Sequence, residues 1–186
     1  PGITVHELAE ALGFSLPLTS HNLKLLASYH LVQTTPSGRY VKCGPPRKDS
    51  TANVFLSRIQ ELLKATLDAG KLNRTLAQVC DSEPDGAGDW KKAFSALVKH
   101  LTAYTHLRRL LILRQLATKG PCSVQELRDA VKMSEDAARR QLDKLVRRGI
   151  VRSAPGGEDK WDLARGEGPE FRKRLLEIVL QAIAPP

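Results

Sequence analysis

Two segments of this chain are similar enough to be copies of one another. Residues 4–32 align without a gap with residues 123–151, and each segment runs on into a short turn that contains proline and glycine. A repeat that keeps its apolar positions while its polar positions change indicates two copies of one fold. The identical pairs are Val5/Val124, Glu7/Glu126, Leu8/Leu127, Ala11/Ala130, Ser15/Ser134, Leu23/Leu142, Leu26/Leu145 and Val32/Val151.

The length and the charge of the chain favour two small domains and a polyanionic partner. A chain of 186 residues has room for about two domains of ordinary size. Residues 1–89 carry nine Lys or Arg and nine Asp or Glu, whereas residues 90–186 carry 20 and 11, so the net charge of +9 belongs to the second half. A basic half favours nucleic acid as a partner, although a merely solvated basic surface would give the same composition.

The composition also indicates in which compartment the protein is expected and whether a metal or cofactor is expected. No apolar run approaches the roughly 18 residues that cross a bilayer, and the first residues lack the basic-then-apolar pattern of a secretory leader. The three cysteines are an odd number without CxxC or CxC spacing, which argues against a disulfide framework and a structural zinc site. We therefore expect a soluble, cytoplasmic protein with no membrane association, no metal and no cofactor.

The second copy has three predicted helices. Leucines at helical spacing predict a helix over residues 105–119. Ser123 and Glu126 have the spacing of a capping box that opens a short second helix. Ser134 is suited to cap a third helix, which Gly149 ends.

A hairpin completes this copy. Residues 150–153 and 160–164 are short β-type runs on either side of a turn. Two helices joined by a tight turn and followed by a β-hairpin form a winged helix-turn-helix. The last helix of such a motif is shaped to enter a major groove of DNA.

The third helix presents the best candidates for contacts with DNA. With Ala138, Leu142 and Leu145 facing inward, a helical projection turns a basic face outward. Arginine can bond the edge of guanine, and both lysine and arginine contact phosphates. The predicted DNA-binding residues are Arg139, Arg140, Lys144, Arg147 and Arg148 on the helix, against the one carboxylate of Asp136, with Arg152 and Lys160 on the hairpin.

The first copy has the same element order but a different outward face. Ser15 caps its third helix, and residues 32–34 and 39–43 predict its hairpin. The outward positions of the helix are mostly apolar, so this face is a weak phosphate binder and suits the docking of another protein element. Burial of Leu25 under the hairpin is an equal alternative. The outward set is Pro17, Leu18, His21 and Leu25, and the DNA-binding residues predicted for this copy are Ser20, His21, Lys24 and Arg39.

The first copy also lacks a counterpart of the helix over residues 105–119. Only Pro1, Gly2 and Ile3 precede its capping position. The apolar stripe of Val5, Leu8 and Leu12 is therefore expected to lie uncovered, unless an upstream or substitute helix covers it.

The remaining apolar periodicity predicts the domain organisation. Residues 52–67 and 170–184 have helical spacing, and the second of these runs is apolar nearly all round at its C-terminal end, which is typical of an interface helix. Turn-forming residues 82–89 mark the expected boundary. We predict a mainly α fold with short β-hairpin wings, arranged as tandem winged helix-turn-helix domains. The predicted parts are residues 1–69, the first copy with the following helix; residues 70–104, a linker with connecting helices; and residues 105–186, the second copy with a C-terminal interface helix.

Five runs of the two copies are typical of one family of regulators. They are RLLILRQLA, VQEL and LDKLVRRGIV in the second copy, and VHELAEALG and TSHNLKLL in the first. These runs resemble the ArsR-like winged-helix repressors. The resemblance implies a transcriptional regulator that binds operators as a homodimer, or here as a single-chain pseudo-dimer because both copies lie in one chain. Members that sense metals use a Cys-x-Cys motif or histidines in the terminal helices, and this chain has neither.

We therefore expect a sequence-specific, DNA-binding transcriptional regulator that reads double-stranded DNA through its second copy. The chain has no Gly-rich phosphate loop, no GxSxG motif and no HExxH motif, so we do not expect an enzyme. The alternative is a tandem winged-helix module for protein–protein interaction in a larger assembly, which the neutral first copy favours.

Overall fold

The fold is mainly α-helical with short β-hairpin wings, and the computed structural model divides it into two compact units. We call residues Pro1–Gln60 unit 1 and residues Glu61–Pro186 unit 2. The predicted three-part organisation stays a prediction, because most of its expected boundary lies outside the described residues. The structure describes residues 2–29, 31–45, 54–67, 72–81, 89–156 and 159–185.

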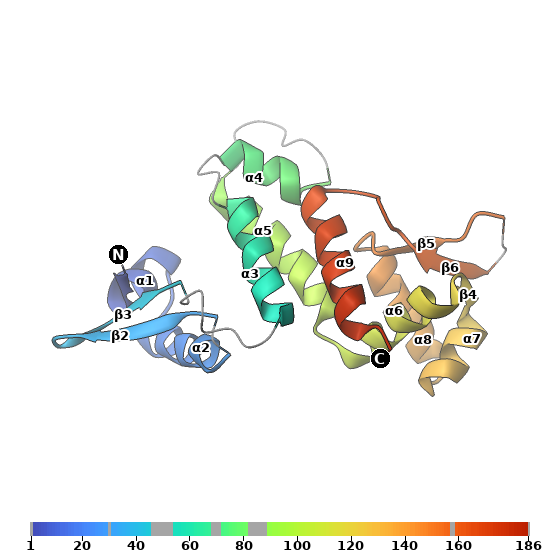
Figure 1. The fold of residues 1–186 in the computed structure, drawn as a ribbon, viewed down its shortest axis with the longest axis horizontal. Helices are drawn as coiled ribbons and strands as arrows, with labels where there is room; N and C mark the ends of the chain where they lie inside the picture. The colour runs from blue at the N-terminus through green and yellow to red at the C-terminus, as the bar shows by residue number, and fades with distance from the viewer. Residues whose placement is uncertain are drawn as a thin grey trace. The chain divides into compact units, whose positions relative to one another are not determined.

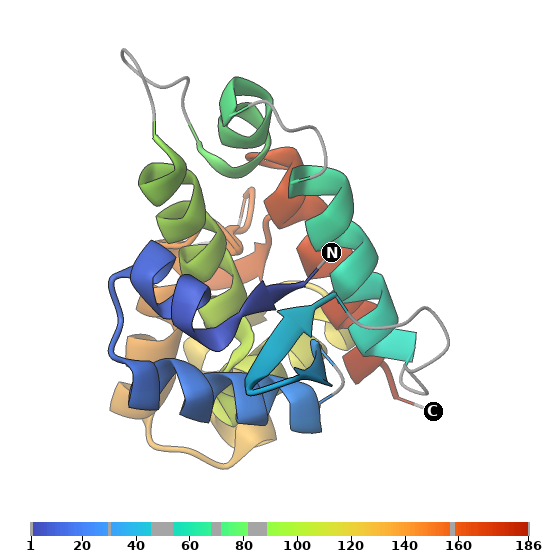
Figure 2. The same cartoon turned by 90° about the vertical axis from the view of Figure 1, so that its left-hand side faces the viewer.

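Unit 1 combines two helices with a three-stranded antiparallel sheet of order β1-β3-β2 (Figures 1 and 2). Cys43 is the central pairing position, since it lies opposite Ile3 on one side and Thr34 on the other. The unit also includes the first part of α3 (Val54–Leu67). Its other elements are β1 (Ile3–Thr4), α1 (Val5–Leu12), α2 (Leu16–Ser28), β2 (Gln33–Ser37) and β3 (Tyr40–Gly44).

Unit 2 repeats this order within a larger helical body (Figure 1). Its antiparallel sheet has the order β4-β6-β5, with Cys122 and Ser153 both opposite Trp161. The elements are α4 (Leu72–Val79), α5 (Trp90–Leu101), the 3-10 helix η1 (Thr102–Tyr104), α6 (Leu107–Lys119), β4 (Cys122–Ser123), α7 (Val124–Val131), α8 (Glu135–Val146), β5 (Val151–Ser153), β6 (Lys160–Leu163) and α9 (Glu170–Ile183).

The short helices α1 and α7 both begin at a capping box, as the sequence predicts for Ser123 and Glu126. The Glu7 amide donates to Thr4 Oγ1 at 3.2 Å, and the Thr4 amide donates to Glu7 Oε2 at 2.8 Å. In α7 the same two bonds join Ser123 and Glu126 at 3.2 and 2.6 Å. Helix starts leave amides without partners, and these side chains supply them. The bonds also lower the pKa of the Glu7 and Glu126 carboxyls.

The strands differ from the prediction in number and extent. The two-residue strands β1 and β4 were not predicted, because two residues carry no periodicity. In the first hairpin, the strand predicted over residues 32–34 is too short, since β2 runs from Gln33 to Ser37, and the strand predicted over residues 39–43 is displaced by one residue, since β3 is Tyr40–Gly44. In the second hairpin β5 begins at Val151 and β6 ends at Leu163, one residue inside each expected end.

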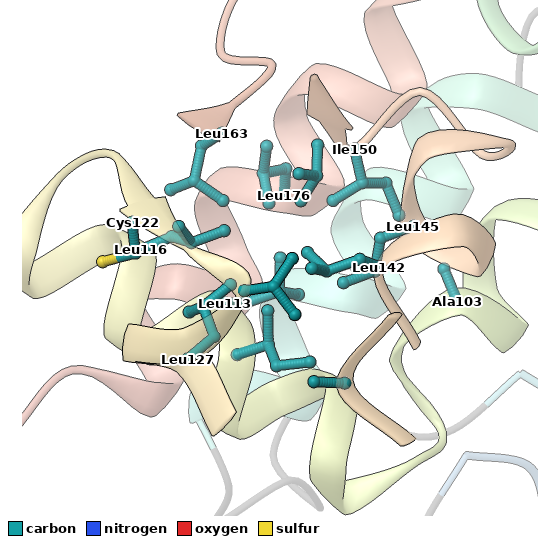
Figure 3. Close-up of a cluster of buried hydrophobic side chains, with 14 residues drawn as sticks. Ala103, Leu113, Leu116, Cys122, Leu127, Leu142, Leu145, Ile150, Leu163 and Leu176 are labelled. Atoms are coloured by element: carbon teal, nitrogen blue, oxygen red, sulfur yellow. The ribbon is translucent and has the colours of Figure 1, made fainter. Parts of the chain in front are cut away.

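All of the winged-helix elements of unit 2 contribute to one cluster of buried hydrophobic side chains (Figure 3). Figure 3 shows Leu113 of α6, Leu127 of α7 and Leu142 of α8 converging on one space. Burial of one such side chain stabilises the fold by about 1.5–3 kcal/mol. Because the apolar stripe of α8 is buried in this cluster, the opposite, polar face of the helix points to solvent. The cluster comprises Ala103, Ile112, Leu113, Leu116, Cys122, Val124, Leu127, Ala138, Leu142, Leu145, Ile150, Val151, Leu163 and Leu176.

Unit 1 has no helix in the place of α6 among its described residues, and its apolar residues are correspondingly exposed. Leu26 is 38% exposed, whereas Leu145 at the corresponding position of unit 2 is 0% exposed. The predicted uncovered stripe is confirmed for Leu12, which is 52% exposed. It is confirmed only in part for Val5 and Leu8, which are half-buried.

Candidate nucleic-acid interface

The turn between α7 and α8 positions α8 for contact with a ligand. Lys132 ends α7 in the left-handed conformation, with φ 54°. Ser134 then caps α8, since its hydroxyl accepts a hydrogen bond from the Ala137 amide at 3.3 Å. A helix pair joined by a short turn of this kind is what a helix-turn-helix requires.

Three cationic side chains extend from α8 and its C-terminal end into solvent. Arg140, Lys144 and Arg147 are all exposed. Arg147 is anchored weakly through its Nε, which donates to the Asp143 carbonyl at 3.3 Å. Within the described residues no hydrogen bond or ion pair occupies the side chain of Arg140 or Lys144. These two cations can therefore bind a polyanion without breaking an existing contact.

The outer face of α8 is less positive than the helical projection implied. Glu135 and Asp143 are exposed on the same helix, in addition to Asp136. Arg139 donates to Glu135 Oε1 from Nε at 3.0 Å and from Nη2 at 2.7 Å. That hydrogen-bonded pair raises the pKa of Arg139. Arg139 must exchange a carboxylate for a phosphate or base before it can bind DNA.

Arg148 lies at the end of α8 but turns back into the protein. Its Nη1 donates to the Lys99 carbonyl at 2.6 Å and to Thr102 Oγ1 at 3.0 Å. The side chain is half-buried. Arg148 was predicted to contact DNA, but these hydrogen bonds hold its side chain against the C-terminal end of α5.

The wing carries the two other predicted cations of unit 2. Lys160 is exposed at the start of β6, opposite Ser123 in the sheet. Arg152 on β5 is exposed as well, but its Nη1 donates to Glu167 Oε1 at 2.5 Å. Lys160 is thus the more available of the two for a phosphate.

The corresponding face of unit 1 is apolar. On α2, Leu18 is 47% exposed and Leu25 is 51% exposed. The alternative that Leu25 packs under the hairpin is therefore wrong, since the unit offers no cover for it in the described residues. Leu16 and Phe14 add to the same exposed apolar set, at 48% and 49%.

The polar residues predicted to contact DNA from unit 1 are few and separate. His21 and Lys24 are exposed on α2, and Ser20 is half-buried beside them. Arg39 lies exposed in the turn between β2 and β3. These positions place one lysine on the face of α2, where α8 places Arg139, Arg140 and Lys144.

Comparison with known proteins agrees with this geometry. Residues 108–154 match a helix-turn-helix domain. The match runs from the start of α6 through α7 and α8 to the end of β5, so it includes the helix that carries Arg140 and Lys144, but not β6, which carries Lys160. Neither the curated proteins nor the solved structures contain a match to the chain. Unit 2 thus contains a helix-turn-helix domain, the kind of domain through which DNA-binding regulators contact DNA.

Two carboxylates that pair with predicted DNA-binding arginines were missed from the sequence. Glu135 lies four residues before Arg139, and this spacing is itself a signal for a pair on one helix face. Glu167 lies beyond the wing, 15 residues from Arg152, and no local pattern joins the two. Both carboxylates reduce the charge that the domain presents.

The cysteines do not form a metal centre in the part of the chain that the structure describes. Cys43 and Cys122 are buried in the two sheets, and burial raises the pKa of both thiols. Cys80 is half-buried and also free. The described residues contain no group of three or more His, Cys, Asp or Glu that could hold a metal ion. They also contain no helix with the length and apolarity needed to span a membrane.

Proposed function

We propose that the chain is a transcriptional regulator that recognises a specific sequence of double-stranded DNA through the helix-turn-helix domain of unit 2. The observation that carries the proposal is that Arg140 and Lys144 on α8 are exposed and make no hydrogen bond or ion pair within the described residues, next to a wing that carries Lys160. We further propose that the regulator is of the ArsR-like type, that it is cytoplasmic and that it has no enzymatic activity.

The residues have distinct roles in this proposal. Arg140 reads a base edge in the major groove, and Arg139 joins it after releasing Glu135. Lys144, Arg147 and Lys160 bind phosphates, which supply affinity that falls as salt rises. Base contacts discriminate between sequences and phosphate contacts do not.

We also propose that unit 1 is a second copy of the winged-helix motif. Its elements follow one another in the same order as those of unit 2, and its sheet has the same strand order. DNA recognition then involves two copies, either as a homodimer of the chain or as a pseudo-dimer within one chain. Two-fold related motifs bind half-sites about one DNA turn, roughly 34 Å, apart.

The test begins with selection of a duplex from a random pool by the full chain. The dissociation constant is then measured for the selected duplex and a scrambled duplex at several salt concentrations. Arg140→Ala should cost about 1–3 kcal/mol at one base position, whereas Lys160→Ala should weaken both duplexes alike. Enrichment of no sequence, or binding that does not change with salt, would refute the proposal.

The exposed apolar face of α2 favours a second candidate function for unit 1. In unit 2 the helix pair is covered by α6, an amphipathic helix that packs leucines against α7 and α8. A partner with an amphipathic, leucine-bearing helix would cover Leu12 and Leu26 in the same way. Unit 1 would then be a protein-interaction module, and substitution of Leu12 and Leu26 by serine would weaken binding of that partner and leave DNA binding by unit 2 unchanged.

A further inference from the structure

Two arginines converge on the C-terminal end of α5, at a corner formed by Lys99 and Thr102. Arg148 Nη1 donates to the Lys99 carbonyl at 2.6 Å and to Thr102 Oγ1 at 3.0 Å. Arg109 of α6 approaches the same corner, and its Nη2 donates to the Thr102 carbonyl at 3.1 Å. The last carbonyls of a helix lack intrahelical donors and carry its negative dipole end, so guanidinium groups suit this place.

The main chain at Arg148 is held as well. Its carbonyl accepts a hydrogen bond from Arg172 Nη1 at 3.3 Å, and the same nitrogen donates to Asp81 Oδ1 at 2.6 Å. Gly149 makes this approach possible, because a Cβ at that position would lie 2.6 Å from Arg172 Nη1. The segment just after α8 is therefore bonded to α5 through a side chain and to α9 through the backbone.

Arg148 differs in this respect from the other cations of α8. The Nη1 group has two hydrogens, and both have acceptors within the protein. A phosphate contact through that nitrogen would leave the Lys99 carbonyl and the Thr102 hydroxyl without this donor. Arg140 and Lys144 have no such contact to lose within the described residues.

We propose that Arg148 is a positioning residue, which fixes the C-terminal end of α8 to the α5–η1 corner and so sets the angle at which Arg140 and Lys144 meet DNA. This inference rests on the proposed function of unit 2. A helix of 12 residues is about 18 Å long, so a tilt of about 5° moves its far end by about 1.5 Å. Base readout needs placement within about 0.5 Å, whereas a flexible lysine follows a phosphate through larger shifts.

The test compares Arg148→Met with Arg147→Met in the full chain, using the selected duplex and the scrambled duplex. Arg148→Met keeps an unbranched stem and removes the donors, and we expect at least a tenfold loss of affinity for the selected duplex with less than a twofold loss for the scrambled one. The dependence of log Kd on log salt should keep the wild-type slope. Arg147→Met should instead weaken both duplexes alike and lower the slope by about 0.9, the value for one lost phosphate contact.

Two further variants separate geometry from charge and guard against misfolding. Thr102→Val removes one acceptor of Arg148 while leaving every cation in place, and it should lower affinity for the selected duplex in the same direction as Arg148→Met. Arg148→Lys retains a donor and the charge, and it should restore part of the selectivity. The urea midpoint of each variant shows whether the chain is folded under the binding conditions.

Several results would overturn the inference. If Arg148→Met weakens both duplexes equally and lowers the salt slope, Arg148 is a phosphate contact. If neither Arg148→Met nor Thr102→Val changes selectivity, the corner does not position α8. Failure of the wild-type chain to prefer any duplex refutes the proposed function itself, and this result differs from a loss confined to the variants.

Discussion

At the scale of single residues, the ends of α1 and α7 differ in one informative way. Gly13 ends α1 with φ 65° and Lys132 ends α7 with φ 54°, at corresponding positions of the two units. The left-handed conformation costs a residue with a Cβ about 1–2 kcal/mol, and glycine avoids this cost. Unit 2 therefore keeps a lysine at a strained position within its helix-turn-helix domain.

Replacing Lys132 by glycine should stabilise unit 2. The relief of the left-handed strain exceeds the greater chain entropy of unfolded glycine, which costs about 0.4–1 kcal/mol, so we expect a net gain of about 0.5 kcal/mol. Urea unfolding of the full chain measures it. Lys132→Ala is the matched control, because it removes the charge and keeps the Cβ. A gain in the alanine variant equal to that in the glycine variant would assign the effect to charge instead.

His100 makes unit 2 sensitive to acid. The ring is buried at 3% exposure, and its Nε2 donates to the Val79 carbonyl at 2.7 Å. Burial lowers the pKa of His100, and the nearby Arg172 lowers it further, against the raising effect of the Val79 bond. Because the unfolded chain then binds a proton more readily than the folded one, stability falls as the pH drops below the ordinary histidine pKa of about 6.5.

We predict that His100→Gln reduces the loss of unfolding free energy between pH 8 and pH 5.5. Glutamine can still donate to the Val79 carbonyl, but it does not titrate. Urea unfolding at the two pH values gives the comparison, with wild-type chain as the reference. Equal pH dependence in the two proteins would show that His100 does not bind its proton more weakly when folded.

At the scale of elements, the two helix pairs differ in what covers them. The side chains of Leu145 and Leu26 occupy corresponding positions, but α6 packs on the first and no described helix takes that place over the second. Leu145→Ala should cost about 2–5 kcal/mol, the range for a buried leucine. Leu26→Ala should cost less than half of that, because 38% of the residue is already in contact with water. Amide resonances of each unit, followed during urea unfolding, measure the two costs separately, and similar costs would contradict the difference in burial.

The sequence predicted the elements whose signals are local. The capping box at Ser123 placed the start of α7, because the capping bonds join residues three apart. Apolar periodicity likewise placed Leu142 and Leu145 inward on α8. These predictions succeeded since neighbouring residues along the chain supply both the pattern and the contact.

Non-local contacts were outside the reach of that reasoning. Arg148 was grouped with the outward cations by helical projection, yet its bonds to Thr102 and Lys99 join residues 46 and 49 positions apart. The strands β1 and β4 exist only because each pairs with a hairpin more than thirty residues away, as at Cys122↔Trp161. Only the folded chain brings these groups together.

At the scale of the whole molecule, corresponding elements of the two units carry different surface chemistry. The excess positive charge belongs to residues 90–186, which include the helix-turn-helix domain. Unit 1 carries exposed leucines on the face where unit 2 carries arginine and lysine. This division is expected if unit 2 binds DNA and unit 1 binds protein or plays a lesser part at the DNA.

The most direct measurement is an amide NMR titration of the full chain with the duplex that it selects. If unit 2 reads DNA, the resonances of α8 and of the β5–β6 wing shift in proportion to bound duplex. In Arg140→Ala, the same concentration of duplex causes smaller shifts. If those resonances stay in place while α2 or other surfaces respond, the helix-turn-helix domain of unit 2 is not the part that recognises DNA.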